Sequence, residues 1–289
     1  MLPTFVIGLR EGVEAALIVG IIAAFLRKEG GRENAMRGVW IGVAAAIAIC
    51  VCVGVALEIV NEDLPQKQQE GLETVIAALA VGAVTFMIVW MRRHARSIAG
   101  ELRQSTATAL AAGTTTALVA MAFFAVIREG LETVVFLLAA FQNATNPTTA
   151  GLGALLGVLC AVGIGVAIYR GGIKLNLTRF FRVTGVVLVF VAAGLVASAL
   201  HTAHEAGWVN FGQESAFDLS WLVVPGTWTA SLLTGMLGLQ PFPVVIEVVG
   251  YGLYAVPILL YLLLPDRFRP RVRRRADARA REELAVAGE

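Results

Sequence analysis

Seven long apolar runs dominate the sequence and restrict the chain to a helical membrane protein. The hydrocarbon core of a bilayer is about 30 Å thick, which about 20 residues of α-helix can cross. Of the 289 residues, 57% are hydrophobic and only 15% are charged, whereas a soluble domain carries roughly 25% charged residues. The composition therefore excludes a conventional soluble enzyme. The runs cover residues 2–26, 38–60, 70–91, 115–142, 150–169, 183–204 and 242–264.

Basic residues gather in alternate connections between these runs. The connections after the first, third and fifth runs carry Arg27, Lys28, Arg32 and Arg37; Arg92, Arg93, Arg96 and Arg103; and Arg170, Lys174, Arg179 and Arg182. Lys67 is the only basic residue in the connections after the second, fourth and sixth runs. Because cytoplasmic loops hold the positive excess, the sequence predicts an N-terminus outside the cell and a C-terminus in the cytoplasm.

Two copies of the motif Arg-Glu-Gly-x-Glu place six charges in the middle of apolar runs, at residues 10–14 and 128–132. An ionised side chain at the bilayer centre costs about 2.5–3.5 kcal/mol, so such residues face a protein interior or a wet cavity. Within each motif the arginine can pair with the glutamate four residues later, as Arg10 with Glu14 and Arg128 with Glu132. That pairing leaves Glu11 and Glu129 less neutralised. Structural salt bridges are the alternative, but four carboxylates exceed what two arginines need.

The spacing of the two motifs predicts an inverted repeat. The motifs lie on the first and fourth runs, so helices 1–3 and helices 4–6 would be related by a pseudo-twofold axis in the membrane plane, followed by a seventh helix. Such an axis would gather Glu11, Glu14, Glu129 and Glu132 at mid-membrane, with Arg10 and Arg128 as charge partners. The fold class predicted is thus an all-α membrane protein with seven transmembrane helices.

The predicted domain organisation is a single membrane domain at residues 1–265 and a basic cytoplasmic tail at 266–289. Repeat one covers about 1–92 and repeat two about 115–204, followed by an outer connection at 205–241 and a last helix at 242–264. Within the connection, residues 219–239 form a weaker apolar stretch interrupted by Pro225. We interpret this stretch as a loop helix or a re-entrant segment.

The side predicted to face outside is acidic and carries a second group of candidate metal ligands. A weaker motif copy supplies Glu70 and Glu73 at the start of the third run, and His201, His204 and Glu205 end the sixth. Glu58, Glu62 and Asp63 would form an acidic approach. Carboxylate and imidazole ligands suit iron or manganese. The alternatives are acidic residues at an ordinary helix start and polar residues that cap a helix end; a metalloprotease is disfavoured because neither H-E-x-x-H nor H-x-x-E-H is present.

These residues resemble the oxidase-dependent iron transporter family, which includes fungal high-affinity iron permeases and bacterial EfeU-type iron permeases. The resemblance covers roughly residues 1–265. It depends on the two Arg-Glu-Gly-[Leu/Val]-Glu motifs on the first and fourth helices, on Glu70 and Glu73, and on segments 85–93 and 201–207.

The resemblance implies a transporter, not an enzyme, that imports iron across the plasma membrane, the inner membrane of a bacterium. The motif glutamates would handle the ion, with Fe3+ favoured over Fe2+ as transported substrate and no permanently bound cofactor. The implied partners are the lipid bilayer, an extracytoplasmic oxidase or haem peroxidase and an iron-binding protein, without nucleic acid. The alternative is a transporter of another metal such as manganese or lead.

Overall fold

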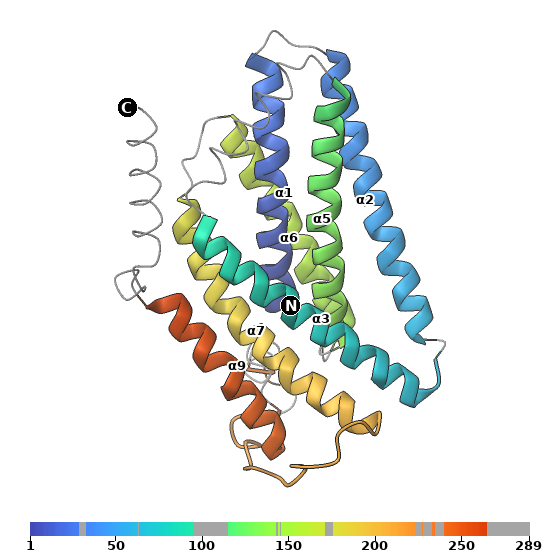
Figure 1. The fold of residues 1–289 in the computed structure, drawn as a ribbon, viewed down its shortest axis with the longest axis vertical. Coiled ribbons are helices and arrows are strands. Elements are labelled where there is room, and N and C mark those ends of the chain that lie inside the picture. The colour runs from blue at the N-terminus through green and yellow to red at the C-terminus, as the bar shows by residue number, and fades with distance from the viewer. Residues whose placement is uncertain are drawn as a thin grey trace, which may run out of the picture.

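The chain folds into seven long helices within the residues that the structure describes. The computed structural model describes residues 1–28, 33–62, 64–94, 115–142, 144, 146–170, 176–223, 227, 233–234 and 240–264. The helices are α1 (Leu2–Lys28), α2 (Glu33–Glu62), α3 (Gln66–His94), α5 (Thr115–Gln142), α6 (Pro147–Tyr169), α7 (Leu177–Glu205) and α9 (Val245–Leu263) (Figure 1). An isolated bridge between Ser215 and Val244 is the only β pairing among these residues.

Each predicted run lies on one of these helices, and most helices extend beyond the run. Hydropathy detects the apolar part of a helix and misses its polar first turn. Helix α6 begins at Pro147 because the Asn146 side chain accepts hydrogen bonds from the backbone N–H groups of Thr148 and Thr149, at 3.0 and 3.3 Å. Proline is favoured in a first turn, where its missing N–H is not needed. The predicted ends were therefore wrong by up to six residues, as at α7.

Five of the helices, α2, α3, α6, α7 and α9, are long and apolar enough to cross a membrane. Helices α1 and α5 are as long, with 27 and 28 residues, but each carries three charged residues in its interior. Asp63, the tail at 266–289 and most of the stretch at 219–239 lie outside the described residues. The same holds for the Glu62 side chain.

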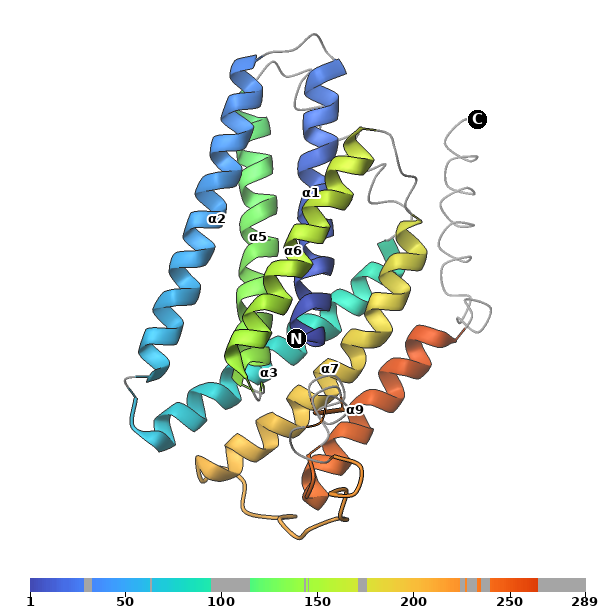
Figure 2. The ribbon, with the colours of Figure 1, turned by 180° about the vertical axis from the view of Figure 1, so that it is seen from behind.

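The helices form two groups that cross each other. Helices α1, α2, α5 and α6 run alongside one another, and α3, α7 and α9 cross them at a slant (Figures 1 and 2). The principal packing pairs are α1 with α6, α2 with α5, α3 with α7, α7 with α9, and α1 with α5. The two helices that carry the charged motifs thus pack against each other, which places the first motif and Glu129 of the second in the interior of the bundle.

Small residues allow α1 and α6 to approach at backbone contact. A Cβ atom added at Gly157 would lie 2.3 Å from the Phe5 carbonyl oxygen, and one added at Gly153 would lie 2.2 Å from the Met1 carbonyl oxygen. The Thr4 hydroxyl donates a 2.7 Å hydrogen bond to the Ala150 carbonyl across the same interface. Close approach of this kind is how small residues stabilise helix pairs in a bilayer. It fixes the position of α1 and hence of its charged motif.

Charges are sorted between the two ends of the helices. Consecutive helices run in opposite directions (Figure 1), so alternate helix ends share a side. Arg27, Arg37, Arg92, Arg170 and Arg182 lie at one set of ends, and Glu58, Glu70, Glu205 and Glu247 lie at the other. The sequence distributes these charges over alternate connections, and the tertiary structure gathers them at two opposite ends of the bundle.

Candidate metal centre

The first charged motif is buried where α1 meets α5. Arg10 and Glu11 are each 1% exposed, and Glu14 is 9% exposed. The Arg10 guanidinium lies 2.8 Å from Glu11 Oε1 and 3.3 Å from Glu14 Oε1. One arginine is thus shared by two carboxylates. The predicted pair of Arg10 with Glu14 is confirmed, but the prediction that Glu11 would be less neutralised was wrong, because the shorter contact of Arg10 is to Glu11.

The second motif, on α5, is divided between the interior and a more open edge. Arg128 Nε lies 3.1 Å from Glu132 Oε1, as predicted for residues four apart. The Arg128 side chain is 51% exposed and the Glu132 side chain 22% exposed. Glu129 is buried and lies 4.0 Å from Arg128 Nε, which is the outer limit of an ion pair. Glu129 is therefore the least neutralised carboxylate of the two motifs.

Three carboxylates of the two motifs converge on one point. Ligand oxygens of Glu11, Glu14 and Glu129 lie within 4.8 Å of one another. Among the described residues, Glu11 Oε2, Glu14 Oε1 and Glu129 Oε2 are buried without a hydrogen-bond partner. Buried acceptors are normally satisfied, and hard cations are bound by such carboxylate oxygens. The arrangement fits a metal cation held by three glutamates.

The structure does not bring Glu132 into this group. Its carboxylate accepts from the Arg128 guanidinium, on the more exposed side of α5. The sequence predicted that four carboxylates line one site, whereas the geometry gives three around a point and a separate Arg128–Glu132 pair. The Arg10–Glu14 pair is buried, whereas the Arg128–Glu132 pair lies at the more exposed edge of α5, and sequence spacing does not contain that difference.

Aromatic and sulfur-containing side chains surround the two guanidinium groups, and sequence reasoning did not find them in this role. The Arg10 guanidinium carbon lies 5.8 Å from the Phe181 ring centroid, and that of Arg128 lies 5.7 Å from the Trp90 centroid. Met87, which is buried, contacts Arg10 through its sulfur. Cation–π contacts within 6 Å stabilise a desolvated guanidinium. Their only sequence signal was the position of Met87 and Trp90 in segment 85–93.

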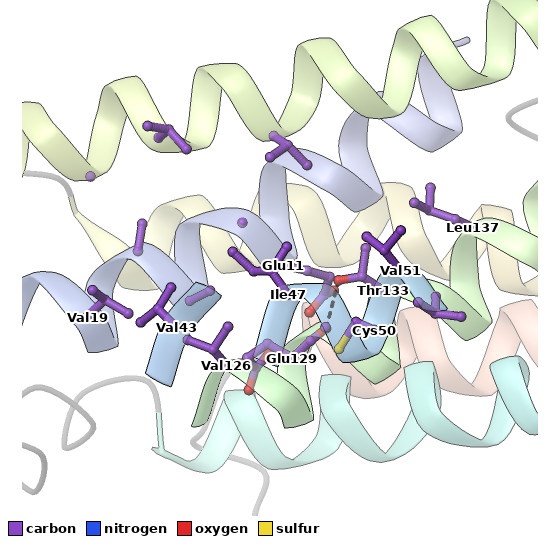
Figure 3. Close-up of a pocket in the computed structure, with 18 of the residues that line it drawn as sticks. Glu11, Val19, Val43, Ile47, Cys50, Val51, Val126, Glu129, Thr133 and Leu137 are labelled. Atoms are coloured by element: carbon purple, nitrogen blue, oxygen red, sulfur yellow. Dashed lines mark hydrogen bonds between the residues drawn. The ribbon is translucent and has the colours of Figure 1, made fainter. Parts of the chain in front are cut away.

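An apolar groove reaches the glutamates from the side of the bundle. It has a volume of about 940 Å³, with walls from α2 and α6 and a floor from α1 and α5. Glu11 and Glu129 lie close together in the floor, with Cys50 and Thr133 beside them (Figure 3). Glu58 lines the groove nearer the acidic ends of the helices. Most of the other lining residues are aliphatic, so the groove is not a route for a hydrated ion.

The acidic ends of α3, α7 and α9 form a second cluster. His201 Nδ1 lies 2.9 Å from Glu247 Oε1, and His201 Nε2 lies 3.4 Å from Glu205 Oε1. The Glu70 carboxyl group lies against that of Glu205. The structure thus brings three of the predicted outer ligands together, Glu70, His201 and Glu205.

Sequence reasoning missed Glu247 as a member of this cluster. It is 3% exposed, and its Oε2 also accepts from the Val244 backbone N–H at 3.2 Å, at the start of α9. An acidic residue in the first turn of a helix is normally interpreted as a partner of the helix dipole. Nothing in the sequence pairs it with His201, 46 residues earlier.

The other two predicted outer ligands form their hydrogen bonds with groups outside this cluster. His204 Nδ1 lies 2.7 Å from the Val209 carbonyl oxygen, in the turn after α7. Glu73 Oε1 accepts from the side-chain amides of Asn61 and Gln69, each at 3.4 Å. His204 has the capping role that was the alternative in the sequence analysis.

Comparison of the sequence with known proteins finds one family and several similar relatives. Residues 1–268 match the iron permease FTR1 family. A ferrous iron permease EfeU of Yersinia pestis is 45% identical over 269 residues, which cover 92% of this chain and 95% of the relative. A ferrous iron permease EfeU of Escherichia coli O6:K15:H31 is 44% identical over 270 residues, covering 92% and 97%. No solved structure matches the chain. The range matched by the family contains both charged motifs and every described helix.

Proposed function

Because this chain belongs to the iron permease FTR1 family, we propose that it imports iron across the cytoplasmic membrane through a site made by Glu11, Glu14 and Glu129. The family consists of transporters, so the chain is a multi-pass membrane transporter and not an enzyme. The observation that carries the proposal is the convergence of three buried carboxylates, from both motifs, within 4.8 Å. Arg10 and Arg128 act as charge partners that offset the repulsion between the carboxylates.

We propose that the seven helices span the membrane as an inverted repeat with a cytoplasmic C-terminus. The packing supports this. In such a repeat, α1, α2 and α3 correspond to α5, α6 and α7. The α1–α6 contact then corresponds to the α5–α2 contact, and the α1–α7 contact corresponds to the α5–α3 contact. All four contacts occur. The orientation follows from the basic helix ends, since cytoplasmic faces carry the positive excess.

The charge of the site favours ferrous iron. Three ionised carboxylates and the Arg10 guanidinium carry a formal charge of −2, which Fe2+ neutralises and Fe3+ leaves at +1. A net charge left at mid-membrane is unfavourable, because ionised groups in the membrane interior are costly. The relatives are named as ferrous iron permeases. We therefore propose Fe2+ as substrate, although the sequence resemblance had favoured Fe3+.

The valence is tested by uptake of radioactive iron into proteoliposomes. Iron held ferrous by ascorbate should enter at least roughly tenfold faster than ferric citrate, because of the charge difference. Competition by manganese and lead in the same assay tests the alternative substrates. Faster uptake of ferric iron would reject the charge argument, and stronger inhibition by manganese than by unlabelled iron would reject iron as the preferred ion.

The outer cluster of Glu70, His201, Glu205 and Glu247 is proposed to capture iron before it enters. Glu58, Glu62 and Asp63 would form an acidic approach to this cluster. Glu73 lies near Glu70 and would add to its negative charge. No permanently bound cofactor is proposed. The resemblance also implies partner proteins, namely an extracytoplasmic oxidase or haem peroxidase and an iron-binding protein. These partnerships remain predictions.

Substitution of the two histidines separates capture from transport. In His201→Asn, the KM for iron uptake should rise roughly tenfold with little change in maximal rate, because an outer ligand is lost while the central site is intact. His204→Ala should leave KM unchanged and lower stability by about 1 kcal/mol, because it loses a hydrogen bond to Val209. Uptake kinetics and thermal unfolding in detergent measure the two effects. Equal KM values in both variants would contradict an outer ligand role for His201.

A further inference from the structure

We propose that the groove between α2 and α6 binds one anionic phospholipid. Its acyl chains would lie between the two helices, and its phosphate would contact Arg27, Arg37 and Arg170. This inference concerns the lipid-facing side of the protein and does not depend on which ion is carried.

The groove has the chemistry of an acyl-chain site. Its α2 wall presents Trp40, Ile47 and Val51, which are 55%, 52% and 58% exposed, and its α6 wall presents Val162 and Val166. Apolar side chains exposed along a membrane-facing groove are covered by hydrocarbon.

One end of the groove is surrounded by cations from three helices. Arg27 lies one turn beyond the lining residue Ala23 on α1. Arg37 follows the lining residue Met36 on α2, and Arg170 follows the lining residue Tyr169 on α6. The Arg27 guanidinium carbon lies 6.0 Å from the Tyr169 ring centroid.

These three arginines are available to a ligand. Each is exposed, and none forms an ion pair within the described part of the chain. Arginine is the preferred partner of phosphate oxygens, and basic pockets between transmembrane helices on the cytoplasmic side bind anionic headgroups.

The opposite end of the groove gives the lipid a single orientation. It carries Glu58, and the floor between the two ends carries Glu11 and Glu129. An anionic headgroup would be repelled at the acidic end and attracted at the basic end, so only a lipid of the cytoplasmic leaflet fits. Its chains would cover the two floor carboxylates from the bilayer side and keep the groove closed to water.

Trp40 provides a local probe of the occupant. Full-length protein is reconstituted in vesicles that contain increasing fractions of phosphatidylglycerol or phosphatidylcholine with brominated chains, which quench nearby tryptophan. The signal of Trp40 is the difference between the wild type and Trp40→Phe, because the chain has five tryptophans. Half-maximal quenching should require an at least roughly fivefold lower mole fraction of phosphatidylglycerol than of phosphatidylcholine, since even one of the three arginines near an anionic headgroup contributes about that factor.

The arginine variants test the headgroup contact. The triple variant Arg27→Gln, Arg37→Gln, Arg170→Gln should quench equally with both lipids. The control Arg182→Gln removes a charge from the same side of the protein, on α7, away from the groove, and should keep the preference. Equal quenching in the wild type, or a preference that survives in the triple variant, would overturn the proposal. So would a Trp40 signal that neither lipid quenches in a protein that is dimeric by light scattering, because a second copy would then cover the groove.

Discussion

Replacing Glu129 with glutamine should abolish iron uptake, with a fall of at least roughly 100-fold in initial rate. Glu129 contributes one of the three converging carboxylates, and its only ion pair within the described residues, to Arg128, is 4.0 Å long. Glutamine keeps the shape and removes the charge, so the site loses a ligand with little effect on the fold. Loss of an outer-shell partner alone costs 10–100-fold in metal affinity, and a direct ligand contributes at least as much. Uptake of radioactive iron into proteoliposomes measures the effect.

The matched control is Glu132→Gln on the same helix. Glu132 pairs with Arg128 at the more exposed edge and is outside the three-carboxylate group, so we expect its uptake to fall less than tenfold. Membrane insertion and elution volume in detergent should be unchanged in both variants. If Glu132→Gln were as inactive as Glu129→Gln, four equivalent carboxylates would describe the site better than three. Undiminished uptake in Glu129→Gln would remove the centre of the proposed function.

Adding one methyl group at Gly157 should destabilise the protein by about 3 kcal/mol and remove most uptake. The new Cβ would lie 2.3 Å from the Phe5 carbonyl oxygen and 2.8 Å from the Leu9 backbone nitrogen. Backbone atoms cannot move aside as a side chain can, so α1 must shift away from α6. Overpacking of this kind typically costs 1–3 kcal/mol. The same shift displaces Glu11 and Glu14, because both belong to α1.

Gly163→Ala on the same helix isolates the steric effect. Among the described residues, no heavy atom of a neighbour lies within 4 Å of a Cβ placed at Gly163. Alanine there should leave uptake intact and raise stability slightly, since alanine is favoured over glycine in a helix by about 1 kcal/mol. Thermal unfolding in detergent and iron uptake are measured for both variants. Similar behaviour of Gly157→Ala and Gly163→Ala would show that α1 and α6 are not in backbone contact.

The sequence alone predicted the helices and the chemistry of the central site. Runs of apolar residues long enough to cross a bilayer have few alternative structures, because unsatisfied backbone groups are not tolerated in hydrocarbon. Charges such as Arg10 and Glu129 inside those runs could only be buried in protein or line a wet cavity. The identity of the motif residues, and therefore the type of cation they suit, was also contained in the sequence.

Only the tertiary structure decided how those residues are grouped. The meeting of α1 with α5 joins Glu129 to Glu11 and Glu14 and leaves Glu132 with Arg128, although both motifs have the same spacing. The slanted packing of α3, α7 and α9 brings Glu247 to His201, while the turn after α7 holds His204 elsewhere. Spacing along one helix determines which side chains share a face. The depth and rotation at which two helices meet are determined by close contacts such as those at Gly157, which a sequence pattern does not specify.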